Sequence, residues 1–167
     1  MNKPASNATP RAALVTGGAR RVGLAITRAL AEAGYAIAVH ANTARAEADA
    51  ICAEIRGRGG RAEAVQADLN DHAEVLRLVP AAAAAVGSLT LLVNNASMFE
   101  ADDIASLDRG LFDRHMAVHV RAPLFLAQAF AAQAPDAADA SIVNMLDQRV
   151  MKPTPLFLSY ALSKNGL

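Results

Sequence analysis

Tyr160 and Lys164 lie four residues apart near the end of the 167-residue chain, and their side chains could transfer a proton. In a helix this spacing places both side chains on one face. Tyrosine ordinarily has a pKa of about 10, too high for acid–base work at neutral pH. A nearby ammonium group favours the phenolate, so we expect Lys164 to lower the pKa of Tyr160. The same pair is also frequent on ordinary amphipathic helices, and by itself it assigns no activity.

A glycine-rich segment near the other end of the chain could hold a phosphate. Residues 16–23 read TGGARRVG, in which Gly17 permits a tight turn and Gly23 lets the following segment pack closely. A helix that begins here would direct free N–H groups at an anion. Arg20 and Arg21 add guanidinium groups, which suit an extra phosphate or an anionic edge of a substrate. A plain turn with two surface arginines explains this short motif about as well.

Polar residues that follow three further apolar runs could complete a nucleotide site. Folds that bind NAD usually have an acidic residue after the second strand, where it bonds the ribose 2′-hydroxyl. Residues 40–45 contain no acidic residue, which favours NADP over NAD. The candidate contacts to the adenosine and its 2′-phosphate are Arg21, His40, Asn42, Thr43, Arg45, Asp68 and Leu69, and those to the ribose are Asn94, Ala96 and Ser97. Helix caps at Asn42, Thr43 or Asp68, and a turn at residues 94–95, are the alternatives.

These residues need a scaffold that brings the ends of the apolar runs together. Short apolar runs, typical of buried strands, alternate with segments whose apolar residues recur at helical spacing. Strands are predicted at residues 12–16, 36–40, 61–66, 89–93 and 141–145. Helices are predicted at residues 21–33, 44–56, 71–86 (interrupted or kinked at Pro80) and 111–133 (with Pro123 inside), and a last one begins near Leu156. This alternation predicts an α/β fold with a doubly wound parallel sheet of Rossmann type, whose ligands bind beyond the carboxyl ends of the strands.

Composition narrows the possible partners. Lys+Arg and Asp+Glu both number 16, and the resulting net charge of +0 argues against a nucleic-acid partner. No apolar window approaches the roughly 18 residues that cross a bilayer. The single cysteine, Cys52, cannot form an internal disulfide. We therefore expect a cytoplasmic protein with a small-molecule substrate and no membrane partner.

The chain is predicted to hold one domain and a short leading segment. Residues 1–11 are polar, contain Pro4 and Pro10, and are expected to form a flexible tail. Residues 12–167 are expected to form an NADP-binding domain. A complete sheet of this kind has at least about six strands, whereas the sequence accounts for five. Because Tyr160 also lies so near the end, we expect the domain to be truncated after the fifth strand and the start of the following helix.

Four features follow one another along the chain, namely TGGARRVG at residues 16–23, Asp68, NNAS at residues 94–97 and YALSK at residues 160–164. In this combination and order they resemble the motifs of the short-chain dehydrogenase/reductase family. Other details are similar to the pteridine reductases of that family. Arg21 stands in a glycine position, Ser97 stands where most members have glycine, and Phe99 follows two residues later. Asp147, thirteen residues before Tyr160, stands where the family usually has its catalytic serine.

The resemblance implies an NADPH-dependent reductase that converts a dihydropterin to a tetrahydropterin by hydride transfer. It implies that Asp147 and Tyr160 handle protons and that Lys164 holds the nicotinamide ribose and tunes Tyr160. The implied substrate contacts are Arg21, Ser97, Phe99 (stacked on the pterin), Asp147 and Tyr160. The implied cofactor contacts are Thr16, Gly17, Arg20, Arg21, Val22, Gly23, His40, Asn42, Thr43, Asp68, Leu69, Asn94, Ala96, Ser97, Tyr160 and Lys164. Family members commonly pair through the helices that correspond to residues 111–133 and 156 onward, which implies a homo-oligomer, a dimer or tetramer.

His119 departs from the family pattern, which usually has asparagine in the stretch that here reads VHVRAP at residues 118–123. His119 could relay protons, or the relay could be impaired. With His115 four residues earlier it could bind a metal, but no obvious third ligand accompanies the pair, and we expect none. Two alternatives to a pterin reductase stay open, namely a general NADP(H)-dependent carbonyl or hydroxyl oxidoreductase of the same family and a non-catalytic cofactor-binding fragment.

Overall fold

The structure, a computed structural model, describes residues 11–135 and 139–167. Of the tail expected over residues 1–11, only Arg11 lies within these ranges. Among the described residues, five strands form one parallel sheet in the order β3-β2-β1-β4-β5. They are β1 (Ala12–Val15), β2 (Ala36–Ala41), β3 (Ala62–Gln66), β4 (Leu91–Asn94) and β5 (Ser141–Asn144). The order reverses between β1 and β4, the kind of switch point at which doubly wound sheets bind ligands.

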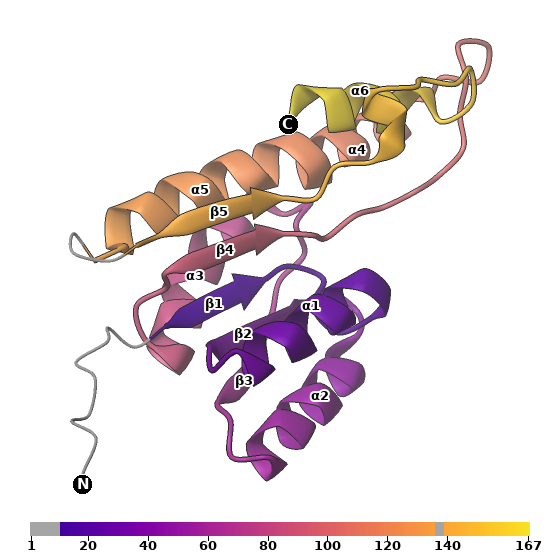
Figure 1. Cartoon of the computed structure of the whole chain (residues 1–167). Coiled ribbons are helices and arrows are strands. Elements are labelled where there is room, and N and C mark those ends of the chain that lie inside the picture. The colour runs from indigo at the N-terminus through magenta and orange to yellow at the C-terminus, as the bar shows by residue number, and fades with distance from the viewer. Residues whose placement is uncertain (1–10, 136–138) are drawn as a thin grey trace, which may run out of the picture.

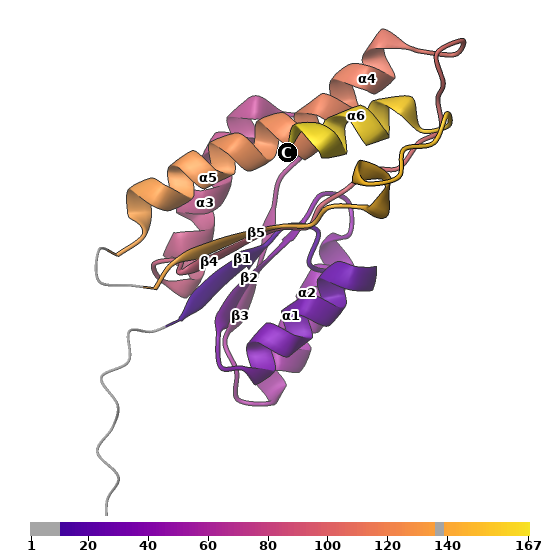
Figure 2. The same ribbon diagram turned by 45° about the horizontal axis from the view of Figure 1, so that its top comes forward.

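Helices cover both faces of the sheet, as Figures 1 and 2 show. On one face lie α1 (Arg21–Glu32) and α2 (Arg45–Gly57), and on the other lie α3 (His72–Val86) and α5 (Ala122–Gln133). The helix α4 (Arg109–Met116) continues in the direction of α5, and α6 (Leu158–Gly166) packs beside α4. This arrangement confirms the predicted doubly wound α/β fold. None of the helices in the described ranges combines the length and the apolar character needed to span a membrane.

Two apolar clusters, one on each face of the sheet, hold the layers together. Every residue of β1 and β2 is buried, as expected for strands that helices cover on both sides. Leu14 and Leu92 pack toward α3 and α5, whereas Val15 and Ile37 pack toward α1 and α2. The edge strand β5 differs, because all four of its residues are exposed.

Three features of the helices differ from the sequence prediction. Of the two alternatives predicted at Pro80, an interruption is wrong, because α3 runs through it with its apolar face buried against the sheet, and a kink stays a prediction. The long helix begins at Arg109 and contains a π-helical turn, η1 (Ala117–Arg121), just before Pro123. Proline offers no N–H to the preceding turn, so a wider turn fits at this point. A short 3₁₀ helix, η2 (Gln148–Val150), precedes α6, which begins after Phe157 because that residue adopts a left-handed φ of 64°.

Candidate active site

The loop between β1 and α1 has a tight conformation that only glycine allows at two positions. Gly17 has a φ of +62°, and an added Cβ would lie 3.0 Å from the Cα of Ala96. At Gly23 an added Cβ would overlap the carbonyl oxygen of Gly17. The first turn of α1 therefore lies directly against the loop, and its free N–H groups lie beyond the carboxyl end of β1. Such a backbone cradle suits a phosphate group.

Thr16 and Asn95 bind this loop to the end of β4. Thr16 Oγ1 accepts the backbone N–H groups of Asn95 and Ala96 at 2.9 and 3.0 Å. Asn95 Nδ2 donates to the carbonyl oxygens of Thr16 and Gly17 at 2.8 and 3.2 Å. Asn95 was not among the predicted contacts, although two successive amides at a strand end are the sequence signal for it. Its role in the structure is to fix the loop.

His40 and Asn94, both predicted cofactor contacts, have buried side chains that bond to the protein. His40 Nδ1 accepts the Gly17 N–H at 3.0 Å, so Nε2 carries the hydrogen that reaches the Ala67 carbonyl oxygen at 3.0 Å. Burial lowers the pKa of His40, which keeps it neutral as this bonding requires. Asn94 Nδ2 donates to Asn144 Oδ1 in β5 at 2.8 Å. Both side chains therefore position neighbouring segments, and a contact of either with a cofactor stays a prediction.

A cavity of about 330 Å³ opens where these loops meet. Seven predicted cofactor contacts line it together, and they are Gly17, His40, Asn42, Asp68, Leu69, Ala96 and Ser97. Asp68 Oδ1 accepts from Asn42 Nδ2 at 3.3 Å and from the Asn70 N–H at 2.9 Å. The alternative that Asp68 caps the next helix is wrong, because the side chain of Asp71 caps α3. Asp68 therefore lies at the cavity rather than at the helix end.

The predicted phosphate-binding arginines lie on the surface beside the loop. Arg20 forms an ion pair with Glu47, and Arg45 forms one with Asp49 at 2.9 Å. Arg21 opens α1 with a φ of 49° and is exposed. Exposed ion pairs contribute little to stability, so either paired guanidinium can exchange its partner for an anionic ligand at small cost. The other predicted contacts that are exposed here are Val22, Asn42 and Thr43.

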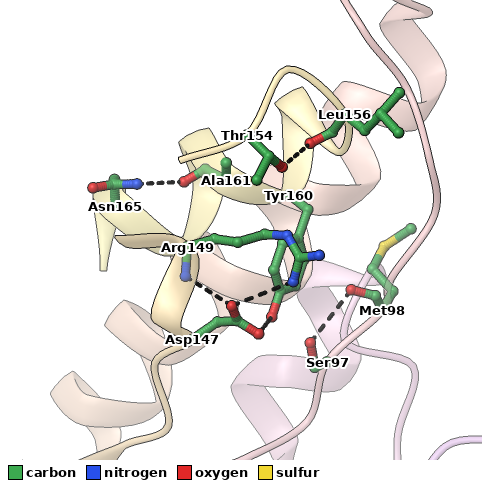
Figure 3. Close-up of polar contacts among 9 residues, drawn as sticks. All are labelled: Ser97, Met98, Asp147, Arg149, Thr154, Leu156, Tyr160, Ala161 and Asn165. Carbon is green, nitrogen blue, oxygen red and sulfur yellow. Dashed lines mark hydrogen bonds and ion pairs between the residues drawn. The ribbon is translucent and has the colours of Figure 1, made fainter. Parts of the chain in front are cut away.

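The predicted acid–base residues meet between η2 and α6, where Figure 3 shows Asp147 between Arg149 and Tyr160. The Tyr160 hydroxyl donates to Asp147 Oδ2 at 3.0 Å. Asp147 Oδ1 accepts the backbone N–H of Arg149 at 2.9 Å and lies 3.5 Å from Nη1 of the same residue. The bond from that N–H lowers the pKa of Asp147. The carboxyl group is therefore ionised at neutral pH and accepts on both oxygens.

Tyr160 differs from its prediction in the direction of its pKa shift. Burial, together with the neighbouring Asp147, raises the pKa of Tyr160 to about 12. Lys164 Nζ lies 5.9 Å from the centroid of the phenol ring and donates to the Met145 carbonyl oxygen at 2.8 Å. The prediction that Lys164 lowers the pKa of Tyr160 is wrong for this structure, because the hydroxyl bonds to a carboxylate while the ammonium faces a backbone carbonyl.

Phe99 forms an aromatic wall beside this pair. Its ring meets Tyr160 edge-on, with centroids 4.8 Å apart, and stacks on Phe157 with centroids 4.1 Å apart. The guanidinium carbon of Arg149 lies 5.0 Å from the centroids of both phenylalanine rings. Flat surfaces of this kind stack planar heterocycles. Phe157 and Arg149 were not predicted, and their only signal in the sequence is their nearness to Tyr160 and Asp147.

His115 and His119 are both buried, and their ring centroids lie 5.4 Å apart. The ring of His119 is bonded to Ser97, Met98 and Ser163. Over residues 11–135 and 139–167, no three side chains of His, Cys, Asp or Glu gather as a possible metal site. The hydrogen bonds of His119 therefore go to protein groups.

Comparison with known proteins shows the family of the chain. The chain matches the family model described as short chain dehydrogenase over residues 11–167. FolM alternative dihydrofolate reductase 1 from Brucella suis, solved in complex with NADP, is 46% identical, with a TM-score of 0.90 over 93% of this chain. The angucycline C-6 ketoreductase LanV, solved with bound NADP, is 31% identical, with a TM-score of 0.86 over 94% of this chain. The short chain dehydrogenase/reductase dpchG from Colletotrichum higginsianum is 36% identical over 160 residues, or 92% of this chain.

The chain spans only part of these relatives. The matches cover 64% of the FolM chain, 63% of the LanV chain and 58% of dpchG. Within the chain itself, the family model covers both the glycine-rich loop and the pair Tyr160 and Lys164. The chain belongs to the short-chain dehydrogenase/reductase family.

Proposed function

We propose that the chain acts as an NADPH-dependent reductase that converts a dihydropterin to a tetrahydropterin. The observation that carries the proposal is the 3.0 Å bond between Tyr160 and Asp147, with the ring of Phe99 edge-on to the phenol. A phenol and a carboxylate beside an aromatic wall suit a planar heterocycle with ring nitrogens. The 46% identity to a FolM alternative dihydrofolate reductase supports the same substrate class.

NADP(H) fits the loop between β1 and α1. Gly23 has no room for a Cβ, because it would overlap the Gly17 carbonyl oxygen, so glycine at this position lets α1 pack closely against the loop. The free N–H groups of the first turn of α1 then lie where a pyrophosphate would bind. Residues 40–45 contain no acidic group that would repel a 2′-phosphate. We assign the binding of this phosphate to Arg21, Asn42 and Thr43. When bound, the nicotinamide supplies the hydride. Lys164 is assigned to the nicotinamide ribose.

Tyr160 is the proton donor in this proposal. Its hydroxyl keeps its proton at neutral pH, because burial and Asp147 raise its pKa to about 12. Asp147 is the hydrogen-bond acceptor, since both of its oxygens accept hydrogen bonds in the structure. An ionised carboxylate favours a ligand N–H group or a protonated ring nitrogen over a plain ketone oxygen. At one edge of the substrate, Tyr160 therefore donates a proton and Asp147 accepts a hydrogen bond.

Steady-state reduction of dihydropterins with NADPH tests this proposal. We expect turnover by the wild-type protein and a fall in kcat/KM of at least about tenfold for Asp147→Ala, the loss of one charged hydrogen bond. Fluorescence titration of NADPH, run in parallel, shows whether each variant still binds the cofactor. Wild-type protein that binds NADPH and turns over no dihydropterin would overturn the proposal.

A general carbonyl reductase is the second candidate, favoured by the 31% identity to the ketoreductase LanV and by the proton of Tyr160. Asp147→Ser separates the two candidates, because a neutral hydroxyl can donate to a ketone oxygen but lacks the negative charge that favours a protonated ring nitrogen. Ketone reduction should therefore survive this substitution better than pterin reduction. Ketone reduction that survives Asp147→Ala, without pterin reduction, favours the second candidate. Binding of NADPH with turnover of neither class supports the non-catalytic alternative.

We further propose a homo-oligomer that assembles through the two predicted helices, of which α4 and α5 form the first and α6 the second. Leu124 is 61% exposed, and it lines a groove of about 520 Å³ together with Met116 and Val120. Exposed apolar side chains along a helix pair favour association with a second copy. Light scattering is expected to give the mass of a dimer or tetramer, and Leu124→Glu is expected to lower it. A monomeric mass at micromolar wild-type protein would contradict this arrangement.

A further inference from the structure

His119 joins the two sides of the candidate active site through a buried imidazole that is 1% exposed. Its Nε2 receives the Met98 backbone N–H at 3.2 Å and lies 3.0 Å from Ser97 Oγ, both in the loop after β4. Its Nδ1 lies 2.8 Å from Ser163 Oγ in α6. Ser163 Oγ in turn donates to the carbonyl oxygen of Tyr160 at 2.8 Å. One ring thus contacts both the loop of Ser97 and the helix of Tyr160.

The hydrogens of this network can be placed in only one consistent way. A backbone N–H can only donate, so Nε2 of His119 accepts from Met98 and carries no hydrogen. The neutral ring then has its hydrogen on Nδ1 and donates it to Ser163, whose own hydrogen goes to the Tyr160 carbonyl. A doubly protonated ring would place an N–H against the Met98 N–H. Burial agrees with the neutral form, since it lowers the pKa of His119 to about 3.

This tautomer also fixes the direction of the Ser97 hydroxyl. The hydroxyl has one hydrogen and lies near three acceptors, namely His119 Nε2 at 3.0 Å, the Met98 carbonyl oxygen at 3.3 Å and the phenol oxygen of Tyr160. If the hydrogen went to Met98 or to Tyr160, the lone pairs of Ser97 Oγ and Nε2 would face each other at 3.0 Å. The hydrogen therefore lies on the contact to Nε2, whose lone pair it shares with the Met98 N–H, and Ser97 offers only lone pairs to a ligand beside the Tyr160 phenol.

We propose that His119 is a positioning residue that holds Ser97 as an acceptor, so that the site favours ligands with an N–H or O–H donor at this point. The proposal rests on the proposed function, because it names the edge of the pterin that Ser97 reads. Reduced pteridines carry amino and ring N–H groups, whereas a quinone or diketone offers only acceptors. The proposal also answers the question of a relay through His119, since its chain ends at a backbone carbonyl that has no proton to pass on.

The tautomer is tested first, by nitrogen NMR of the ¹⁵N-histidine-labelled protein. The chain has four histidines, and the signals of His119 are assigned by their loss in His119→Gln. We expect a protonated Nδ1, an unprotonated Nε2 and no titration between about pH 5 and 8, where an ordinary imidazole titrates. A proton on Nε2, or a ring that titrates in this range, would overturn the proposal whatever the substrate is.

Ligand preference is tested second, as equilibrium binding of a pteridine and of a quinone to the NADP⁺ complex, so that no turnover is needed. Ser97→Ala and His119→Phe are each expected to weaken pteridine binding about three- to tenfold, the contribution of one neutral hydrogen bond. Quinone binding should change less than about twofold. His119→Gln, whose amide oxygen can still accept from Ser97, is expected to retain part of the preference. The matched control is Ser88→Ala, at an exposed serine in the turn before β4.

Equal weakening of both ligands, or of neither, would overturn the proposal. If His119→Phe does not fold, Ser97→Ala decides alone, because the Ser97 side chain is exposed and removing its hydroxyl creates no cavity. A wild-type complex that binds quinones but no pteridine would contradict the proposed function. In that case the tautomer measurement still decides the role of His119.

Discussion

The nucleotide side and the catalytic side of the candidate site differ in how firmly the chain holds them. On the nucleotide side, every residue of β1 and β2 is buried, and Thr16, His40 and Asn95 bond the loops to one another. On the catalytic side, Tyr160 and Lys164 are buried as well, whereas Asp147 and Arg149 are partly exposed and the neighbouring Met151 is 89% exposed. Figure 2 shows β1 and β2 between layers of helices, and β5 at the edge of the sheet.

This difference shows that the two sides depend on different kinds of interaction. In the proposed function, cofactor binding depends on the backbone of the glycine-rich loop, which the side chains of Thr16, His40 and Asn95 hold in place. The proposed proton transfer depends on side-chain contacts among Asp147, Arg149 and Tyr160. Substitutions on the catalytic side should therefore lower turnover and spare NADPH binding, whereas substitutions in the glycine-rich loop should weaken NADPH binding and lower turnover only because less cofactor is bound.

The largest effect is expected for Tyr160→Phe, which removes the proposed proton donor and keeps the ring against Phe99. Loss of a general acid typically lowers kcat by about 10²- to 10⁴-fold. Binding of NADPH should stay within about twofold, because the backbone of the loop after β1 is untouched. Steady-state kinetics and a fluorescence titration measure the two quantities. A variant that loses binding as well would show that the two sides are not separate.

The next effect is expected for Gly23→Ala, because the new Cβ would overlap the Gly17 carbonyl oxygen. Overpacking of this kind costs about 1–3 kcal/mol of unfolding free energy. The displaced loop should also bind NADPH at least about tenfold more weakly, while any residual turnover keeps its pH dependence. Denaturant melts measure the unfolding free energy, and a titration with NADPH measures the affinity for the cofactor.

Gly57→Ala is the matched control for that substitution. Gly57 lies at the end of α2, where an added Cβ would meet no atom of the described residues within 4 Å. We expect the unfolding free energy to stay unchanged or to rise by up to about 1 kcal/mol. Equal losses at both glycines would mean that the close approach at Gly23 is unimportant.

A smaller effect is expected for the pKa of Tyr160. The chain has two tyrosines, so Tyr35→Phe leaves Tyr160 as the only source of the tyrosinate absorbance. Its titration is expected to have a midpoint at about 12, because burial and Asp147 raise the pKa. Asp147→Asn removes the neighbouring charge and should lower this midpoint while leaving it above the ordinary value of about 10.

The sign of the accompanying stability change follows from linkage. The unfolded chain releases the tyrosine proton at about pH 10, whereas the folded chain keeps it to about pH 12. The contribution of Tyr160 to stability is therefore complete below about pH 10 and is lost as the pH rises to about 12. Across this pH window, the melting temperature of the Tyr35→Phe protein should fall more steeply than that of the variant that also carries Tyr160→Phe. Melting temperatures that fall in parallel in the two proteins would contradict the raised pKa of Tyr160.

The smallest effect is expected for Glu47→Ala, which removes the surface partner of Arg20. Because exposed ion pairs contribute little, the melting temperature should not change measurably. Affinity for NADPH should be unchanged or rise up to about threefold, since the carboxylate no longer competes for the guanidinium. A marked loss of stability would show that this pair holds the loop in place.

Much of the fold follows from local patterns in the sequence. The strands that became β1 and β2 appear as continuous apolar runs because both of their faces are buried. Pro80 misled the prediction, since an intrinsic helix breaker is tolerated when tertiary packing holds the turns on either side of it. The π-helical turn before Pro123 was also not predictable, because it reflects the packing of a long helix rather than a local preference.

The candidate site was predictable where chemistry depends on residue type, and not where it depends on contacts between distant segments. Tyr160 was singled out by its spacing from Lys164 and Asp147 by the resemblance to the family, and the two side chains lie together. The direction of the pKa shift was not predictable, because the burial of the Tyr160 phenol and its bond to Asp147 depend on how distant segments pack against α6. The network around His119 joins residues 97, 119 and 163, and no motif of the sequence links them.

One measurement tests most directly the claim that the nucleotide side binds NADPH and the catalytic side reduces a pterin. Wild-type protein and Tyr160→Phe are each loaded with NADPH and mixed with a dihydropterin in a single-turnover experiment. The account predicts that both bind NADPH with similar affinity, that the wild type oxidises it, and that Tyr160→Phe does so at least about 10²-fold more slowly. Bound NADPH that no dihydropterin oxidises, or equal rates in the two proteins, would contradict it.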